Sequence, residues 1–160
     1  MASPQNNGFE LIECIRMSER EIEHVHPLAG SFAIVEKEGE YLLGYNSLRQ
    51  QWELPAGKRE ENETPLECAK RELVEETGQI VESMQLIGVA RVKNHVTKAD
   101  KFNPLYFSTI YSLMPFIQNE ETSEIKLWDL KEDIQIDQVD LGIIRFIVSF
   151  RLELEDENQI

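Results

Sequence analysis

The sequence predicts an α+β fold in which a mixed β-sheet lies between helices. Three observations lead to this prediction: apolar segments with strand character precede a well-capped central helix, more of them follow it, and an amphipathic helix comes last. A chain of 160 residues fits one domain of ordinary size. We expect this domain over residues 9–152, with a disordered N-terminus at 1–8 and an acidic tail at 153–160.

The segments before the central helix have the composition of short strands. Partial alternation of apolar and polar residues over 9–16 predicts a short edge strand. Residues 31–35 form a buried strand and residues 41–45 its partner, and the Glu-Gly pair at 38–39 supplies the turn of a hairpin. Residues 52–54 form a third extended piece, which a proline stops.

The central helix is predicted over residues 65–77 by signals at both of its ends. Thr64 is placed to cap the N-terminus, Pro65 suits the first helical position, and Glu67 completes a capping box with Thr64. Gly78 stands where a C-terminal glycine belongs.

Three strands and one helix are expected after the central helix. The strands are predicted at 84–93, 105–113 and 124–130. The final helix is predicted at about 138–152, and its apolar stripe contains Val139, Ile143, Ile147 and Phe150.

The charge balance of the chain limits its partners. The sequence contains 30 acidic and 16 basic residues, for a net charge of −14. Such a surface repels a nucleic-acid backbone, so no polynucleotide partner is expected. A small anionic ligand would need a divalent metal or a few placed Arg and Lys side chains.

The sequence also gives expectations about the compartment. No apolar run approaches the roughly 18–20 residues that span a bilayer, so no membrane partner is expected. Residues 1–8 lack the basic region and the apolar core of an export signal. Cys14 and Cys68 match no zinc spacing and are expected to be reduced thiols. We therefore expect a cytoplasmic protein.

The central helix concentrates negative charge in an unfavourable way. Glu72, Glu75 and Glu76 fall within an arc of roughly 100° beside the apolar stripe. Like charges at this spacing repel, and the C-terminal end of a helix disfavours anions. A divalent cation would resolve the repulsion, and Arg71 can offset part of it. The alternative is a solvated acidic helix without a metal.

The spacing of this segment distinguishes the two readings. The segment 57–78 has the pattern Gly-x5-Glu-x7-Arg-Glu-Leu-x-Glu-Glu-x-Gly. This pattern resembles the signature of the Nudix hydrolase (MutT-like) family, with every charged and glycine position present. The resemblance implies an α/β/α sandwich and a Mg²⁺-dependent hydrolase, with Mn²⁺ able to substitute. One position departs, because Gln79 stands where the family has an aliphatic residue; we expect a small shift at the start of the next strand.

The resemblance also implies a set of metal ligands. Glu75 and Glu76 correspond to the principal Mg²⁺ ligands, and Glu72 to a further ligand or a holder of metal-bound water. The carbonyl oxygen of Gly57 or Ala56 is expected to complete the coordination.

The same resemblance implies supporting and catalytic roles for other residues. Arg71 is expected to belong to the catalytic set and to orient the glutamates by ion pairs, while Glu63 fixes the loop. The general base is expected from a later loop, with Glu120, Glu121 and Glu124 as candidates. The alternative for these three is an exposed acidic loop.

The substrate class is suggested by the residues just before the motif. The stretch 53–57, E-L-P-A-G, resembles ADP-ribose and nucleotide-sugar pyrophosphatases. Arg49, Glu53 and Lys58 are expected to bind substrate, with Arg49 near the entrance where it can pair with phosphate. This favours a small nucleotide substrate, a nucleoside diphosphate linked to another moiety. The proline that ADP-ribose-specific members carry downstream is absent from the equivalent region, 93–95.

Two other functions stay open at this point. One is a nucleoside triphosphate pyrophosphatase of the kind that removes oxidised dGTP from the nucleotide pool. The other is a regulator that binds a nucleotide without cutting it. A homodimer is also expected, by analogy with the family, through the edge strand at 9–16.

Overall fold

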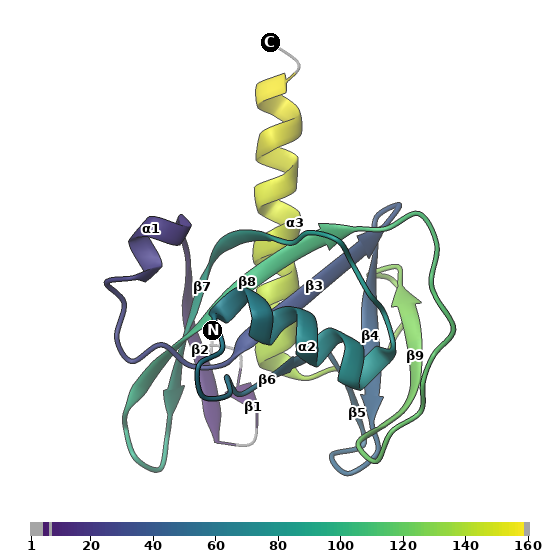
Figure 1. Ribbon diagram of the computed structural model, residues 1–160, viewed down its shortest axis with the longest axis horizontal. Helices are drawn as coiled ribbons and strands as arrows, with labels where there is room; N and C mark the ends of the chain where they lie inside the picture. The colour runs from purple at the N-terminus through teal and green to yellow at the C-terminus, as the bar shows by residue number, and fades with distance from the viewer. Residues whose placement is uncertain (1–4, 7, 159–160) are drawn as a thin grey trace.

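The computed structural model describes residues 5–6 and 8–158 of the chain. The described part contains one nine-stranded sheet with the order β1-β2-β7-β8-β3-β4-β5, in which β6 also pairs with β3 and β9 with β4 (Figure 1). The strands are β1 (Gln5–Asn6), β2 (Phe9–Arg16), β3 (Ser31–Lys37), β4 (Glu40–Asn46), β5 (Gln51–Glu53), β6 (Ala56–Gly57), β7 (Gln85–Asn94), β8 (Asp100–Thr109) and β9 (Thr122–Trp128). The helices are α1 (Glu19–Ile22), α2 (Pro65–Thr77) and α3 (Gln138–Asn158).

The sheet is mixed, as predicted. Strands β3 and β8 run parallel, in a register that sets Phe32 opposite Leu105. The neighbouring pairs β7–β8 and β3–β4 are antiparallel. The parallel pair lies in the middle of the sheet, where both faces are covered, as parallel strands require.

Helix α2 covers one face of the sheet and α3 the other (Figure 1). Successive residues of β3 serve the two faces, since side chains alternate along a strand. Ile34 packs in the apolar cluster that includes Ile143 of α3, while Ala33 and Val35 pack in the cluster that includes Leu73 of α2. All five of these side chains are fully buried. The predicted α/β/α sandwich is therefore confirmed.

The predicted turn of the hairpin is also confirmed. Glu38 and Gly39 both have positive φ, 51° and 86°, as the central residues of a type I′ turn do. This turn joins β3 to β4 and matches the right-handed twist of the two strands.

Several boundaries differ from the prediction. Strand β8 begins at Asp100 and ends at Thr109, earlier at both ends than the predicted 105–113. Helix α3 continues to Asn158, through most of the predicted acidic tail, and projects beyond the sheet (Figure 1). An ion pair between Arg16 and Glu153 ties this extension to β2.

The N-terminal segment only partly falls within the described residues. Of the predicted disordered segment 1–8, residues 1–4 and 7 lie outside them, and Gln5–Asn6 pair with β2 as the short strand β1. Strand β2 is thus covered at Phe9 and Glu10 on one edge and paired with β7 on the other. Within residues 5–6 and 8–158, no helix has both the length and the apolar character to cross a membrane.

Candidate active site

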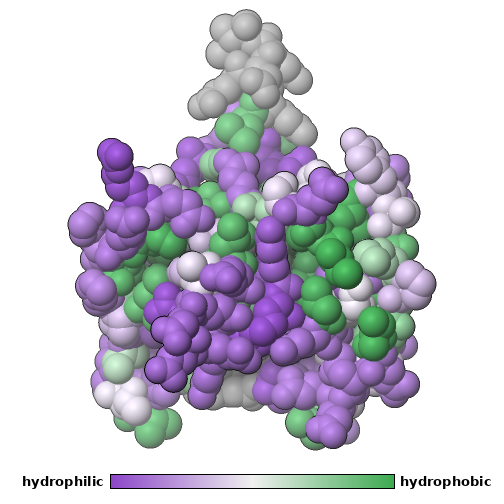
Figure 2. Space-filling view, in the orientation of Figure 1, coloured by the Kyte–Doolittle hydropathy of each residue, from purple (hydrophilic) through white to green (hydrophobic). Residues whose placement is uncertain are grey.

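Helix α2 is fixed in place by its ends and by its apolar stripe. The Thr64 hydroxyl accepts from the Glu67 N–H, and the Glu67 carboxylate accepts from the Thr64 N–H, which confirms the capping box. Gly78 ends the helix with φ of 79°, a left-handed conformation that glycine adopts at little cost. Ala69 and Leu73 are fully buried against the sheet. The acidic flank of the helix is consequently held beside the loop that precedes it, on a hydrophilic face of the molecule (Figure 2).

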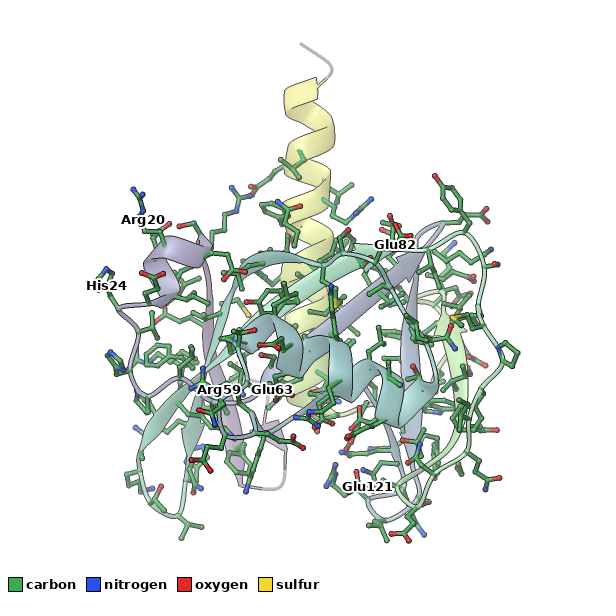
Figure 3. The ribbon with its side chains drawn as sticks, in the orientation of Figure 1. Arg20, His24, Arg59, Glu63, Glu82 and Glu121 are labelled. Atoms are coloured by element: carbon green, nitrogen blue, oxygen red, sulfur yellow. The ribbon has the colours of Figure 1, made fainter. Side chains whose placement is uncertain are left out.

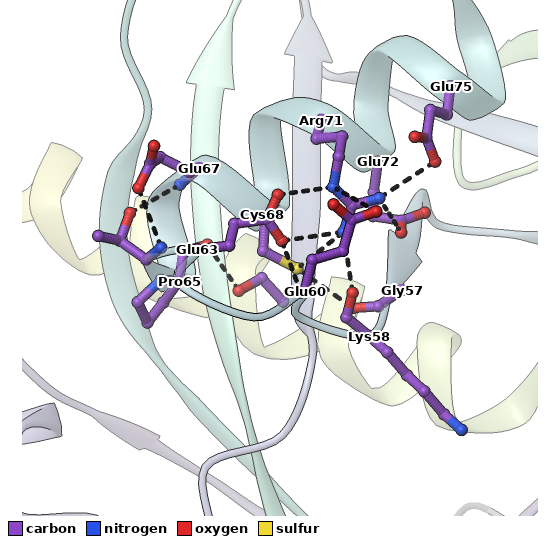
Figure 4. Close-up of polar contacts among 12 residues, drawn as sticks. Gly57, Lys58, Glu60, Glu63, Pro65, Glu67, Cys68, Arg71, Glu72 and Glu75 are labelled. Carbon is purple, nitrogen blue, oxygen red and sulfur yellow. Dashed lines mark hydrogen bonds and ion pairs between the residues drawn. The ribbon is translucent and has the colours of Figure 1, made fainter.

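Arg71 connects the acidic residues of this flank (Figure 4). Its Nε and Nη2 donate to the two carboxylate oxygens of Glu63, at 2.6 and 2.9 Å. Its Nη1 donates to Glu72 at 2.8 Å and to Glu75 at 3.1 Å. Nη2 also donates to the carbonyl oxygen of Lys58 at 2.9 Å. Arg71 thus contacts Glu63, Glu72 and Glu75 together, and its expected role of orienting glutamates and that of Glu63 in fixing the loop stay predictions.

The hydrogen bonds that Glu63 accepts lower its pKa. The Arg71 guanidinium and the Glu60 N–H together lower the pKa of Glu63 to about 2, so this carboxylate is ionised at any ordinary pH. A bidentate Arg–carboxylate contact of this kind fixes both groups in one plane. Glu63 and Arg71 therefore hold the 57–64 loop to the helix.

Glu76 has a different environment from the other two glutamates. Its Oε2 accepts from the Ala56 N–H at 2.9 Å. Burial, with the nearby charges of Glu72 and Glu121, raises the pKa of Glu76 to about 9 in spite of this hydrogen bond. Burial also raises the pKa of Glu72, although Arg71 opposes the change. In the absence of a cation, the site favours at least one protonated carboxyl.

The backbone of β6 approaches these carboxylates closely. A Cβ atom on Gly57 would lie 2.2 Å from the carboxyl carbon of Glu72, so any side chain at this position would displace the Glu72 carboxylate. The Gly57 carbonyl oxygen accepts from the Cys68 thiol at 3.3 Å, and it also faces Gly30, where a Cβ would lie 2.0 Å from it. The backbone of β6 thus adjoins the glutamates through the Ala56 N–H and the Gly57 Cα, while the Gly57 carbonyl oxygen itself faces Cys68 and Gly30.

The donor set suits a hard divalent cation. Within the described residues, no three His, Cys, Asp or Glu side chains are already arranged to hold a metal ion. Two of the glutamates, Glu72 and Glu75, are turned to Arg71 instead. Carboxylate and carbonyl oxygens are nevertheless the ligands that Mg²⁺ prefers, and a cation would replace the proton that Glu76 otherwise keeps.

A cavity of about 640 Å³ is lined by both residues of β6, although Glu72, Glu75 and Glu76 do not themselves line it. One part of its wall is formed by Arg49, Glu53, Ala56 and Gly57, and another part by Phe9, Phe32, Lys101 and Asn103. The size and the mixed apolar and polar lining are those of a small-molecule site.

The expected substrate-binding residues Arg49, Glu53 and Lys58 line this cavity, but they differ in whether they already pair with another side chain. Arg49 and Glu53 are bound to each other, through Nε at 2.7 Å and Nη2 at 2.8 Å. Burial raises the pKa of Glu53, but hydrogen bonds from Arg49 and other side chains outweigh it and lower the pKa overall. Lys58 extends away from the glutamate cluster (Figure 4), and no ion pair is formed by Lys58, Arg59 or Lys101 within residues 8–158. Lys58 and Arg59, unlike Arg49, therefore have no anionic partner among the described residues, and the Lys101 ammonium lies 4.5 Å from the centre of the Phe9 ring.

Sequence reasoning missed two acids of the cavity wall. Asp137 caps α3 by accepting from the N–H groups of Val139 and Asp140, at 2.8 and 3.1 Å. Asp140 is buried, and its Oδ2 accepts from the Leu54 N–H at 2.8 Å. Burial and the neighbouring Asp137 raise the pKa of Asp140 well above its usual range. The only signal in the sequence was an acidic residue at a helix start, which normally indicates a cap alone.

Of the three candidates for the general base, the structure distinguishes Glu121. Its charge contributes to raising the pKa of both Glu72 and Glu76, although burial is the larger cause for each. Figure 3 shows it below the C-terminal half of α2. All three candidates are exposed, but neither Glu120 nor Glu124 is among the main causes of the raised pKa of Glu72 or Glu76.

The chain is similar to known proteins over most of its length. The NUDIX domain family model matches residues 25–149. The RNA pyrophosphohydrolase of Xylella fastidiosa is 38% identical over 55 residues, 34% of this chain and 29% of that protein. The RNA pyrophosphohydrolase of Bartonella henselae is 37% identical over 82 residues, 48% of this chain and 46% of that protein. The matches therefore span less than half of either relative.

A solved structure supports the fold independently. The NUDIX domain of Shewanella oneidensis NrtR, complexed with ADP ribose, superposes with a TM-score of 0.67 at 19% identity. The superposition covers 85% of this chain and 99% of that domain. At this identity the likeness concerns the fold alone.

Proposed function

The chain belongs to the NUDIX family, and on that premise we propose that it is a Mg²⁺-dependent pyrophosphohydrolase acting on a nucleoside diphosphate linked to a second group. One observation carries the proposal: the half-buried Glu72 and Glu76 carboxylates adjoin β6, whose Ala56 and Gly57 also line the cavity of about 640 Å³. A phosphoanhydride bound in that cavity would lie against the acids that can hold a divalent cation. The cations Lys58, Arg59 and Lys101 suit the same anionic ligand.

The metal would be held by oxygen atoms of α2 and β6. We assign Glu72, Glu75 and Glu76 as its side-chain ligands and the carbonyl oxygen of Ala56 or Gly57 as its backbone ligand. A bound Mg²⁺ screens the pyrophosphate charge and lowers the pKa of an attacking water. The pattern of acids fits this role, since Glu76 alone of the three lacks a cationic partner within the described residues.

The residues of the chain then have separate tasks in hydrolysis. Glu121, in the proposal, accepts the proton of the water whose oxygen attacks phosphorus. The bond between that phosphorus and the bridging oxygen breaks, and the products are a nucleoside monophosphate and the phosphorylated second group. Arg71 keeps Glu72 and Glu75 in their orientation, as its hydrogen bonds indicate.

The far end of the cavity would take the nucleoside. Phe32 and the face of Phe9 that Lys101 does not cover would pack against a base, and Asn103 offers polar atoms beside them. Asp137 and Asp140 lie nearer to Glu53 and Leu54, and a protonated Asp140 can donate a hydrogen bond as well as accept one. None of these residues belongs to α2, and in the proposal they serve recognition rather than chemistry.

A second candidate is a substrate that ends in a nucleoside 5′-triphosphate. The observation in its favour is that both curated relatives are RNA pyrophosphohydrolases. The net charge of −14 opposes a long RNA but leaves a free nucleotide open. The free triphosphates tested should include oxidised dGTP.

The decisive experiment is hydrolysis of a panel of substrates with Mg²⁺. The panel contains ADP-ribose, nucleotide sugars, dinucleoside polyphosphates, ordinary and oxidised nucleoside triphosphates and a short 5′-triphosphorylated RNA. Glu76→Gln is the inactive control, and Glu82→Gln, at an exposed acid away from the site (Figure 3), is the matched active one. We expect cleavage of a diphosphate-linked compound, and cleavage of triphosphates alone would replace this proposal by the second candidate. Binding without cleavage of any compound would support the regulator instead.

The homodimer expected from the family stays a prediction. β1 covers only Phe9 and Glu10 of β2, so the rest of that edge is available for pairing in the described part of the chain. Sedimentation equilibrium of the purified protein would measure the oligomeric state directly.

A further inference from the structure

The segment of residues 110–121 between β8 and β9 is attached to the C-terminal end of α2 by the side chain of Gln79. This glutamine follows the helix-ending Gly78 and is 1% exposed. Its Nε2 donates to the Met114 carbonyl at 2.9 Å, and its Oε1 accepts from the Met114 N–H at 2.7 Å. One side-chain amide thus satisfies both backbone groups of a single residue, as a neighbouring strand would do.

Asn119 makes a second attachment from the same segment. Its Nδ2 donates to the carbonyl oxygens of Glu75 and Glu76, at 3.0 and 3.1 Å. Carbonyl groups in the last turn of a helix have no partner within the helix, so Asn119 caps them. Its Oδ1 accepts from the N–H groups of Glu121 and Thr122, at 3.1 and 2.9 Å. The Asn119 side chain therefore links the backbone carbonyl groups of Glu75 and Glu76 to the backbone N–H of Glu121.

Two further contacts hold the same segment. The segment packs against the helix end at Gly78, where a Cβ would lie 3.0 Å from a side-chain carbon of Ile117. On the other side, the Ser47 N–H donates to the Glu121 carbonyl at 2.8 Å. The backbone of Glu121 is consequently held from α2 and from the turn after β4.

We propose that Gln79 and Asn119 are positioning residues that fix the 110–121 segment to α2 and so hold Glu121 beside the last turn of α2, which carries Glu75 and Glu76. The proposal rests on the proposed function, because it is in hydrolysis that Glu121 acts. It also gives a reason for the departure of Gln79 from the aliphatic residue of the family pattern. An aliphatic side chain could fill the same space, but it would leave the Met114 N–H and carbonyl without their partner, at a cost in free energy.

The attachment is tested with Gln79→Leu and Asn119→Ala, and with Gln118→Ala as a control in the same segment. Gln118 is exposed and makes no side-chain hydrogen bond within residues 8–158. We expect amide hydrogen exchange at Met114 in the first variant, and at Thr122 in the second, to accelerate by about tenfold or more. Unchanged exchange at these two amides would overturn the proposal, whatever the activity of the variants.

The kinetic readout separates positioning from a general loss of stability. In both variants kcat should fall by about tenfold or more while KM stays within about threefold, since substrate binding does not depend on Glu121. The control should keep both constants. A lower melting temperature with an unchanged kcat would mean a merely structural role and would refute the proposal. If Gln79→Leu does not fold, Asn119→Ala still provides the measurement, because Asn119 is only half-buried.

A double variant identifies the residue through which Gln79 acts. If Gln79 works by placing Glu121, then Gln79→Leu in a Glu121→Gln background should lower kcat no further than Glu121→Gln does alone. If the decrease in kcat of the double variant equals the two single decreases multiplied together, Gln79 does not act through Glu121. Failure of the proposed function is distinguishable from both results, because in that case the unaltered protein would cleave no substrate while the exchange experiment would still report on the attachment.

Discussion

Replacing Glu76 by glutamine should abolish activity and at the same time stabilise the metal-free protein. The substitution keeps an oxygen that can accept from the Ala56 N–H, a contact of 2.9 Å, and removes the ionisable group. As a proposed Mg²⁺ ligand, Glu76 is needed in its charged form, so kcat should fall by at least about a hundredfold. Acidic residues at functional sites often lower the stability of the folded protein, so their replacement can stabilise it.

The size of the stabilisation follows from the titration of Glu76. Its pKa is raised from 4.5 to about 9, mainly by burial, so at pH 7 the carboxyl is protonated in the folded chain and ionised in the unfolded chain. The folded state then binds the extra proton, and stability falls as pH rises from 4.5 toward 9. The interval from 4.5 to 7 corresponds to about 3.5 kcal/mol, at about 1.4 kcal/mol per pH unit. Glu76→Gln avoids this loss, which raises Tm by roughly 7–14 °C for a chain of this size.

Thermal unfolding with EDTA and with Mg²⁺ provides the assay. Without metal, Glu76→Gln should melt above the unaltered protein at pH 7, and the difference should shrink toward pH 5. Mg²⁺ at about one hundred times its dissociation constant should stabilise the unaltered protein by about 2.7 kcal/mol and the variant by much less. Glu82→Gln, at an exposed acid, should match the unaltered protein in both conditions. A destabilised Glu76→Gln, or equal stabilisation of both proteins by Mg²⁺, would refute the reasoning.

Three other substitutions test separate parts of the structure. Burial raises the pKa of Asp140, so stability should fall as pH rises above its ordinary value of 3.8. Asp140→Asn should reduce this slope by about 1.4 kcal/mol per pH unit in denaturant titrations, and an unchanged slope would contradict the titration. Thr64→Ala should cost about 1 kcal/mol of stability through the lost cap, with kcat/KM unaltered in the folded enzyme. Gly57→Ala should lower kcat by about a hundredfold with an unchanged circular dichroism spectrum, because the added Cβ would lie 2.2 Å from the Glu72 carboxyl carbon; a fully active variant would argue against that contact.

The elements that the sequence predicted best are those with local signals. The bounds of α2 agree with the prediction at both ends, because Thr64, Pro65 and Gly78 act on the backbone within a few residues of where they stand. The hairpin of β3 and β4 was predictable for the same reason, since a glycine at the turn permits positive φ. Such signals operate before any tertiary contact forms.

Elements that depend on pairing with another strand were predicted less well. The first half of β8 is polar and contains Pro104, so its composition does not favour a strand. It is extended because it pairs with β7, with Lys93 opposite Asp100, and because Arg91 forms an ion pair with Asp100 at 2.6 Å. These partners lie within ten residues of each other, but strand propensity and apolar alternation do not reveal a polar contact of this kind.

Some residues of the candidate site were likewise predicted from the sequence and others were not. The spacing of the motif identified the acids and Arg71, since they share one helix and one loop. The opposite wall of the cavity comes from β2, β8 and α3, with Phe9, Lys101 and Asp140, and no common spacing relates these residues. Arg49 was predicted to pair with phosphate, but it is bound to Glu53 four residues away. Whether Arg49 pairs with Glu53 or with a substrate phosphate depends on how the side chains are arranged in the folded chain.

The three glutamates of α2 are equivalent in the sequence pattern but not in the fold. Arg71 donates to Glu72 and Glu75, and within the described residues it makes no bond to Glu76. Glu75 is moreover exposed, so water can stabilise its charge. A carboxylate buried beside like charges is unfavourable unless it is paired. Glu76 therefore depends most on a cation that the chain itself does not supply, and the proposed metal site has its strongest physical argument at this residue.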